Sequence, residues 1–253
     1  MVIAITRPVS PTINKCELTH LSRTDIDVEL AQTQHRNYEK ALAALCCDVR
    51  SLALAPELPD AVFVEDTALV LDEIAVITRP GAAARRAERD SVATALAQYR
   101  DLRWIDAPGT LDGGDILRLG RTIFVGQSKR SNRPGLEQLA LQLKPFGYLV
   151  QAVNVRGCLH LKSAVTPVGP DTLLINRDWV EGRTFDGFRL IDVAPHEPFG
   201  ANALWLGDTV IYPAEYKSTR QMLENGGLAV KTVDVSELGK AEGGVTCCSL
   251  IID

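Results

Sequence analysis

Apolar and polar residues alternate in short runs along this chain, and eight of these runs form pairs around a short polar turn. Alternation with a period of two is typical of strands that bury one face, and a turn of Gly, Asp or Pro between two such runs predicts a β-hairpin. We therefore expect four hairpins: TALVLDEIAVIT from Thr67, DILRLGRTIFVGQ from Asp115, SAVTPVGPDTLLIN from Ser163 and NALWLGDTVIYPA from Asn202.

A fifth strand, GVTCCSLIID, is expected from Gly244, and it extends a regular spacing. Successive units start 48, 48, 39 and 42 residues apart, and such a period combined with hairpins indicates blades repeated around an axis. The partner of the fifth strand would be the N-terminal run MVIAITRP, because the motif Thr-Arg-Pro at residues 6–8 recurs at residues 78–80. The alternative is an ordinary α/β sandwich with coincidental spacing.

Between the hairpins, apolar residues recur at helical spacing. The clearest pattern spans residues 25–45, and others start at Ala82, Arg133 and Tyr216. The fourth unit offers only the ambiguous stretch DWVEGRTFDGF. Helices that alternate with hairpins predict an α/β fold.

Composition excludes several classes of protein. The formal charge of −5 disfavours a general binder of nucleic acid or anionic membranes. No apolar run approaches the roughly 18 residues of a membrane span, and no basic leader precedes a long apolar stretch. The six cysteines lack metal-type CxxC spacing. We expect them to be reduced thiols in the cytoplasm.

Acidic residues stand where the predicted strands begin. Asp60, Glu65 and Asp66 precede one apolar strand, and such carboxylates suit a guanidinium, which is planar and rich in donors. Asp112 lies in GTLDGGDIL, where the two glycines permit a close backbone approach. Each motif alone is also what a solvated turn looks like.

A nucleophile and a base are also present. His160 has the apolar neighbours Leu159 and Leu161, and a lone histidine of this kind is more often structural. Cys247 and Cys248 would point to opposite faces of the fifth strand, so that only one of them can face a pocket. A cysteine nucleophile needs a base or a cation, and a histidine oriented by a carboxylate is the usual partner.

Together these segments resemble the dimethylargininase family of guanidine-modifying enzymes, with a match from about residue 14 to the end. The resemblance rests on LPDAVFVEDTALV, ITRPGAAARR, GTLDGGDIL, FVGQSKRSN, LHLKS, FGANALWL and GGVTCCS. It implies one catalytic domain over residues 1–253. The implied fold is an α/β propeller of five ββαβ units around a pseudo-fivefold axis, closed by pairing of the N- and C-terminal strands.

The resemblance assigns the nucleophile to Cys247, the catalytic histidine to His160 and its carboxylate partner to Asp112. Some bacterial relatives carry Glu where this chain has Asp112, and aspartate is one methylene shorter. The implied substrate-binding residues are Leu18 in a mobile lid, Asp60 and Asp66 near the guanidinium, Glu65 at the amino-acid portion or as loop support, Arg85 and Arg130 at the α-carboxylate, and the backbone of Ala241 at the α-amino group.

The implied reaction converts asymmetric dimethylarginine or monomethylarginine to citrulline plus dimethylamine or methylamine, through a covalent cysteine thiouronium. An arginine deiminase-like hydrolase and an inactive arginine-binding propeller are the alternatives. A joint Cys, His and Asp set argues against the binder. No metal or organic cofactor is expected, although cysteine and histidine together suit an inhibitory zinc ion. The remaining expected partners are the small-molecule substrate and a second copy of the chain in a homodimer.

Overall fold

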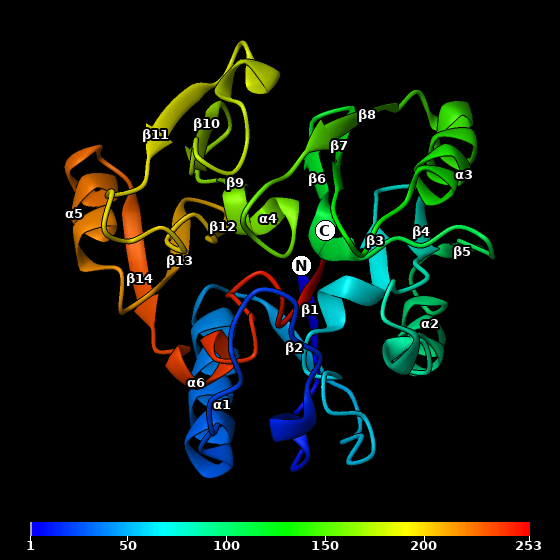
Figure 1. The fold of residues 1–253 in the computed structure, drawn as a ribbon, viewed down its shortest axis with the longest axis horizontal. Coiled ribbons are helices and arrows are strands. Elements are labelled where there is room, and N and C mark those ends of the chain that lie inside the picture. The colour runs from blue at the N-terminus through cyan, green and yellow to red at the C-terminus, as the bar shows by residue number, and fades with distance from the viewer. Residues whose placement is uncertain (1) are drawn as a thin grey trace.

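The structure, a computed structural model, describes residues 2–253, which form five three-stranded sheets in a mixed α/β fold (Figure 1). In every sheet the first strand runs antiparallel to the middle strand, and the third runs parallel to it. The sheets are β15(Leu250–Ile252)–β1(Ile3–Thr6)–β2(Asp48–Ser51), β3(Ala68–Val70)–β4(Ile74–Ile77)–β5(Asp101–Trp104), β6(Ile116–Leu119)–β7(Thr122–Gln127)–β8(Leu149–Asn154), β9(Val165–Pro167)–β10(Thr172–Ile175)–β11(Arg189–Asp192) and β12(Leu204–Leu206)–β13(Thr209–Pro213)–β14(Ala229–Val233).

All four predicted hairpins are confirmed, as β3–β4, β6–β7, β9–β10 and β12–β13. The predicted pairing of the two chain ends is also confirmed, because β1 and β15 are antiparallel, with Ile3 opposite Ile252 and Ile5 opposite Leu250. Met1, which belongs to the predicted N-terminal run, lies outside the described residues. The first sheet is therefore built from both ends of the chain.

The fifth predicted strand is wrong in its extent, because β15 begins at Leu250 and residues 245–248 form a turn. The physical reason is local hydrogen bonding. The amide of Cys247 donates to the carbonyl of Gly244, and the amide of Thr246 donates to the side chain of Asn202. These bonds take the backbone donors that a longer strand would offer to a ladder.

The longer helices follow the predicted patterns; the one predicted from Arg133 starts there, and the other three start at a later residue than predicted. The pattern over residues 25–45 forms a helix only from Val28, because the side chain of Asp27 accepts the amide of Leu30 and caps the N-terminus. No helix within residues 2–253 is long and apolar enough to cross a membrane. The helices are α1(Val28–Ala44), α2(Glu88–Leu96), α3(Arg133–Leu143), α4(Leu161–Ala164), α5(Lys217–Asn225) and α6(Ser236–Gly239), with 3₁₀ turns at η1(Ile13–Lys15), η2(Val64–Thr67), η3(Ala83–Arg85), η4(Gly113–Asp115), η5(Lys144–Phe146) and η6(Gly182–Phe185).

The middle strand of each sheet is buried on both faces and shares its side chains between two apolar clusters. In β4, Ile74 and Val76 pack toward β6 and β7, whereas Ala75 and Ile77 pack toward β1 and β15. The same alternation holds in β1, β7, β10 and β13, so that every cluster is shared by two neighbouring sheets. Figure 1 shows these sheets around the middle of the molecule, with α1, α2, α3 and α5 outside them.

Candidate active site

Short turns that lead into the first strands of four sheets are bonded to one another. They are η2 before β3, η4 before β6, α4 before β9 and the loop 244–249 before β15. The amide of Gly114 donates to Asp66 (3.0 Å), the amide of Leu161 donates to Asp115 (3.0 Å), and the amide of Glu65 donates to the carbonyl of Cys247 (3.1 Å). These bonds bring residues from four sequence segments into one site.

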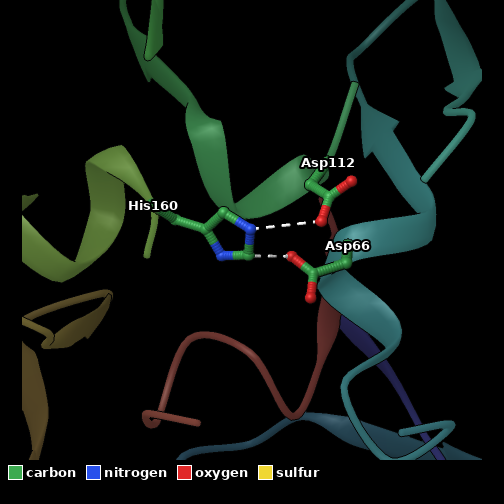
Figure 2. A group of neighbouring side chains, drawn as sticks. All are labelled: Asp66, Asp112 and His160. Atoms are coloured by element: carbon green, nitrogen blue, oxygen red, sulfur yellow. Dashed lines mark hydrogen bonds and ion pairs between the residues drawn. The ribbon is translucent and has the colours of Figure 1, made fainter. Parts of the chain in front are cut away.

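His160 lies between two carboxylates, as Figure 2 shows. Its Nε2 is 3.2 Å from Asp112 Oδ2, and its Nδ1 is 3.7 Å from Asp66 Oδ1. The aspartate at position 112 therefore reaches the imidazole despite its shorter side chain. Gly114 is required beside this group, because a Cβ atom there would collide with the His160 ring and the Asp66 carboxylate.

The electrostatics favour a charged imidazole. Burial lowers the pKa of His160, but Asp66, the hydrogen bond to Asp112 and the charge of Asp115 outweigh burial and raise the pKa to about 9. Burial would raise the pKa of Asp66, yet His160 and Arg85 lower it to about 2. His160 is therefore protonated at neutral pH. The ligand atoms of Asp66, Asp112 and His160 lie within 4.8 Å of one another, as in a metal site, and the charge of protonated His160 offsets one of the two carboxylate charges.

Arg85 is buried and directs its guanidinium at two carboxylates. Its Nη1 donates to Asp66 at 2.6 Å, and its Nε and Nη2 donate to Glu88 at 3.1 and 2.9 Å. Nη2 also reaches the carbonyls of Asp60 and Phe63. Burial raises the pKa of Glu88 to about 7 despite the opposing charge of Arg85. In this structure Arg85 holds Asp66 in place.

Arg130 lies on the other side of the site and has spare donors. Its Nη2 donates to the hydroxyl of Thr19 at 3.0 Å, and its Nη1 is 3.9 Å from Asp112 Oδ2. That Nη1 is buried and has no hydrogen-bond partner among residues 2–253. Because an unpaired buried donor is costly, this guanidinium is suited to a bound anion.

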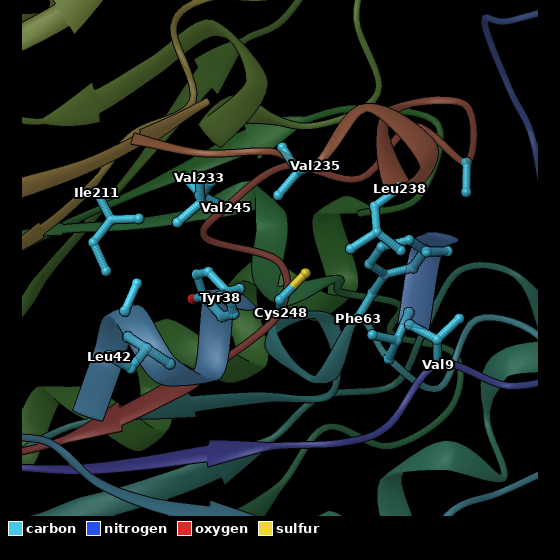
Figure 3. Close-up of a cluster of buried hydrophobic side chains, with 14 of the residues drawn as sticks. Val9, Tyr38, Leu42, Phe63, Ile211, Val233, Val235, Leu238, Val245 and Cys248 are labelled. Atoms are coloured by element: carbon cyan, nitrogen blue, oxygen red, sulfur yellow. The ribbon is translucent and has the colours of Figure 1, made fainter. Parts of the chain in front are cut away.

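Cys247 and Cys248 occupy different environments, as predicted, although they lie in a turn and not in a strand. Cys247 is half-buried at a cavity, and its Sγ accepts the amide of Gly244 at 3.2 Å. Cys248 is fully buried in the apolar cluster with Tyr38 and Leu238 (Figure 3). Burial, followed by the charges of Glu65 and Asp66, raises the pKa of Cys247 to about 12. Its thiol is therefore neutral at neutral pH in this structure.

The cavity beside Cys247 has a volume of about 10 Å³, room for about one water molecule. Seven of the ten predicted site residues line it: Asp60, Asp66, Arg85, Arg130, His160, Ala241 and Cys247. A second cavity, of about 370 Å³, reaches Cys247 from another side and shares Leu159, Glu242 and Gly243 with the first. Cys247 and Glu242 therefore stand at the boundary between two cavities.

Three predicted residues do not line the small cavity. Asp112 is completely buried behind His160. Leu18 is partly buried against the apolar cluster that contains Cys248. Glu65 binds Lys162 and Thr246, and burial raises its pKa. Because both Glu65 oxygens are occupied and its amide holds the Cys247 carbonyl, its geometry fits the second predicted role, loop support.

Several residues of the site carried no sequence signal of their own. Glu88 looks like a surface charge on a helix, and only its buried position beside Arg85 reveals it. Asp115 accepts the hydroxyls of Ser128 and Ser131 and the amide of Leu161, and so fixes the start of α4, which His160 immediately precedes. The second aspartate of LDGGD was the one available signal for this residue.

Comparison with known proteins finds relatives of one family. Residues 10–252 match the family described as N,N dimethylarginine dimethylhydrolase, eukaryotic. The N(G),N(G)-dimethylarginine dimethylaminohydrolases of Pseudomonas aeruginosa and Streptomyces coelicolor are 35% and 39% identical to this chain, over 96% and 98% of it and 96% and 95% of their own lengths.

Solved structures lead to the same family. A variant of the Pseudomonas aeruginosa enzyme complexed with citrulline superposes with a TM-score of 0.94 at 32% identity, covering 98% of both chains. The sequence match and the structural match both extend over nearly the whole chain. This chain therefore belongs to the dimethylarginine dimethylaminohydrolase family.

Proposed function

We propose that this protein hydrolyses N-omega-methylated arginines to citrulline and dimethylamine or methylamine. The observation that carries the proposal is one cavity lined by the thiol of Cys247, the charged imidazole of His160 and the carboxylate of Asp66. A thiol nucleophile, an acid and a group that binds a cation are what displacement of an amine from a guanidinium requires. The citrulline in the related structure corresponds to the expected product.

The reaction begins with a neutral thiol and a cationic substrate. A guanidinium bound beside Asp66 and Asp60 lowers the cost of a thiolate at Cys247, because its positive charge offsets the burial that otherwise raises the thiol pKa, and the thiol proton passes to solvent. The thiolate sulfur then forms a bond to the central guanidinium carbon. His160 gives its proton to the departing amine, and the C–N bond breaks to leave a covalent thiouronium.

The second half of the reaction reverses the role of His160. Having lost its proton, the imidazole accepts one from a water molecule that attacks the thiouronium carbon. The C–S bond breaks, the thiol is regenerated and citrulline is released. Asp112 orients the imidazole through the 3.2 Å contact, and Asp66 stabilises its charged form.

The rest of the cavity would hold the amino-acid end of the substrate. Arg130 offers its unpaired Nη1 to the α-carboxylate, and the backbone of Ala241 lies at the same cavity for the α-amino group. We keep Arg85 as a candidate for the carboxylate, with its bonds to Asp66 and Glu88 supporting an orienting role as well. Because the cavity holds about one water, the residues that line it must move to admit substrate, and the segment of Glu17 and Leu18 is the proposed lid.

One assay tests the function. Citrulline release from asymmetric dimethylarginine, monomethylarginine and arginine is measured side by side. Methylated arginines should give the higher kcat/KM. A clear preference for arginine would favour the deiminase-like alternative, and no release from any of the three would favour the inactive arginine-binding propeller.

We also propose that the five sheets are the blades of one closed α/β propeller over residues 1–253, in a single domain. Two observations support this. All five sheets have the same strand order, and each apolar cluster joins two neighbouring sheets, including the first and the last. The cluster with Cys248 contains side chains of both β1 and β13, which would close the ring.

Zinc inhibition, a homodimer and a cytoplasmic location complete the proposal. Cys247 and His160 line the same cavity, which supports inhibition by zinc through these two ligands. Loss of activity with added zinc, restored by a chelator, is the expected result. Sedimentation of the purified chain tests the dimer, and fractionation of cells tests the location.

A further inference from the structure

The segment of residues 17–21 reaches the small cavity at Glu17 and the larger cavity at His20 and Leu21, and the carboxylate of Glu242 holds it. The backbone amides of Thr19, His20 and Leu21 donate to the two oxygens of Glu242, at 2.8, 2.5 and 2.7 Å. Three successive amides that converge on one anion form a backbone nest. Hydrogen bonds to a charged acceptor are stronger than those between neutral groups. Glu242 is therefore a specific attachment point for this segment.

The backbone of Glu242 is strained in a way that maintains this contact. Its φ is +60°, a region that residues other than glycine rarely adopt. Its amide donates to the carbonyl of Gly239 at 3.0 Å, which fixes the turn between Ala241 and Gly243. Strain of this kind persists where the surroundings over-determine a residue, and it concentrates at functional sites.

Two further bonds hold the same segment, and both come from the cavity itself. The amide of Glu17 donates to both oxygens of Asp60 at 3.2 Å, and Arg130 donates to the hydroxyl of Thr19. Asp60 and Arg130 are also proposed substrate contacts, so a substrate competes for or reorganises these two bonds. Among the described residues, in contrast, the Glu242 carboxylate accepts hydrogen bonds only from the amides of this segment.

We infer that Glu242 is a positioning residue of the reaction, which holds residues 17–21 closed over the bound amino acid. Its effect on substrate rests on the proposed function. If closure is needed for tight binding, the apparent affinity scales with the closed fraction of the protein. Loss of the hydrogen bonds to Glu242 therefore weakens substrate binding while the chemistry at Cys247 and His160 stays intact.

The test compares Glu242→Gln and Glu242→Ala with a matched control, Glu224→Gln. Glu224 is a glutamate on α5 that interacts with Arg220 and lines neither cavity. With monomethylarginine as substrate, both Glu242 variants should raise KM by about tenfold or more, as expected for loss of one charge-assisted hydrogen bond, with kcat changed much less. The control should match the parent in both constants.

A second measurement follows the hydrogen bonds between residues 19–21 and Glu242 without any substrate. Hydrogen exchange at the amides of residues 19–21 should be faster in both Glu242 variants and unchanged in the control. This result is independent of the proposed function. Faster exchange in the Glu242 variants, together with no turnover by the parent, would refute the proposed function but would still support the attachment of residues 19–21 to Glu242.

Reaction of Cys247 with 2-chloroacetamidine completes the design. This small amidine has no amino-acid end and needs no closed segment, so its labelling rate should be maintained or increased in the variants. Parent-like exchange at residues 19–21 in Glu242→Gln would overturn the inference. So would equal losses of labelling and turnover, because they would indicate damage to the site itself. If Glu242→Ala fails to fold, Glu242→Gln decides the matter, since it keeps the shape of the side chain.

Discussion

The two cysteines of the loop before β15 are adjacent in sequence and face two different regions. Around Cys247 lie Asp66, His160 and other charged groups, which are buried and bonded across four sequence segments. Around Cys248 lie Tyr38, Leu238 and further apolar side chains of the neighbouring helices. The first region requires side chains of a given charge and orientation, whereas the second requires side chains of a given volume.

The difference shows what a buried turn achieves that a strand does not. In a strand, alternation alone would separate the two thiols, and the backbone would be committed to a ladder. In the turn, the Gly244 amide is free to donate to the Cys247 sulfur, and the carbonyl of Cys247 accepts the amide of Glu65. The proposed nucleophile is thereby fixed by the backbone of two segments.

The largest difference between the two regions is expected from the cysteines themselves. Cys247→Ser should abolish turnover, because the higher pKa of a hydroxyl leaves almost no anion at neutral pH. A haloacetamidine label should map to Cys247 by mass spectrometry, and substrate should block it. An active Cys247→Ser beside an inactive Cys248→Val would reverse the comparison.

Removal of the imidazole tests whether the charged region is catalytic. His160→Asn should lower kcat by about 10²–10⁴ or more, the range for loss of a general acid and base. Substrate binding should change little, because the proposed contacts lie on other residues; isothermal titration measures it. Activity within a few-fold of the parent would remove His160 from the mechanism.

The two arginines separate binding from support within the charged region. Arg130→Ala should weaken binding of amino-acid substrates by roughly 1.5–3 kcal/mol and should not affect a decarboxylated analogue. Arg85→Ala should weaken the binding of both kinds of substrate. It should also lower the free energy of unfolding by about 3–5 kcal/mol, because Asp66 and Glu88 lose their partner. Chemical denaturation and kinetics with both substrates distinguish the variants. If Arg85→Ala also spares the decarboxylated analogue, Arg85 binds the α-carboxylate as well.

The stability of the charged region should depend on pH through His160. Its pKa of about 9 lies above the ordinary 6.5, so the folded state favours the protonated form. The resulting stabilisation is complete below about pH 6.5 and is lost as pH rises through about 9. The advantage of the parent over His160→Asn in unfolding free energy should therefore shrink by up to roughly 3 kcal/mol over this interval. Urea titrations across the range measure it, and a constant difference would refute it.

The smallest effect is expected on the apolar side. Cys248→Val keeps a hydrophobic side chain of similar volume, so it should cost less than about 1.5 kcal/mol of stability and leave kcat unchanged. Thermal unfolding and the citrulline assay check both. A severe loss of activity with normal stability would show that Cys248 takes part in the chemistry.

Much of the fold was predictable because the middle strands of its hairpins are buried on both faces and carry strong apolar runs. The third strands were not, since β5 alternates between exposed and partly buried positions, β8 is mostly exposed apart from Val153, and both resemble surface loops. Resemblance to the family pointed to Cys247, His160 and Asp112. Glu242 was missed because its partners are backbone amides, which leave no pattern in a sequence.

The pairing of β1 with β15 has a consequence for how the protein is made. Four of the five sheets use strands that are neighbours in sequence, and these sheets can assemble while synthesis continues. The first sheet waits for β15, which is synthesised after its partner β1 and after the strands of the other four sheets. Pairings so distant in sequence form slowly. Cys247 precedes β15 by only three residues, so the growing chain positions its proposed nucleophile as this pairing forms.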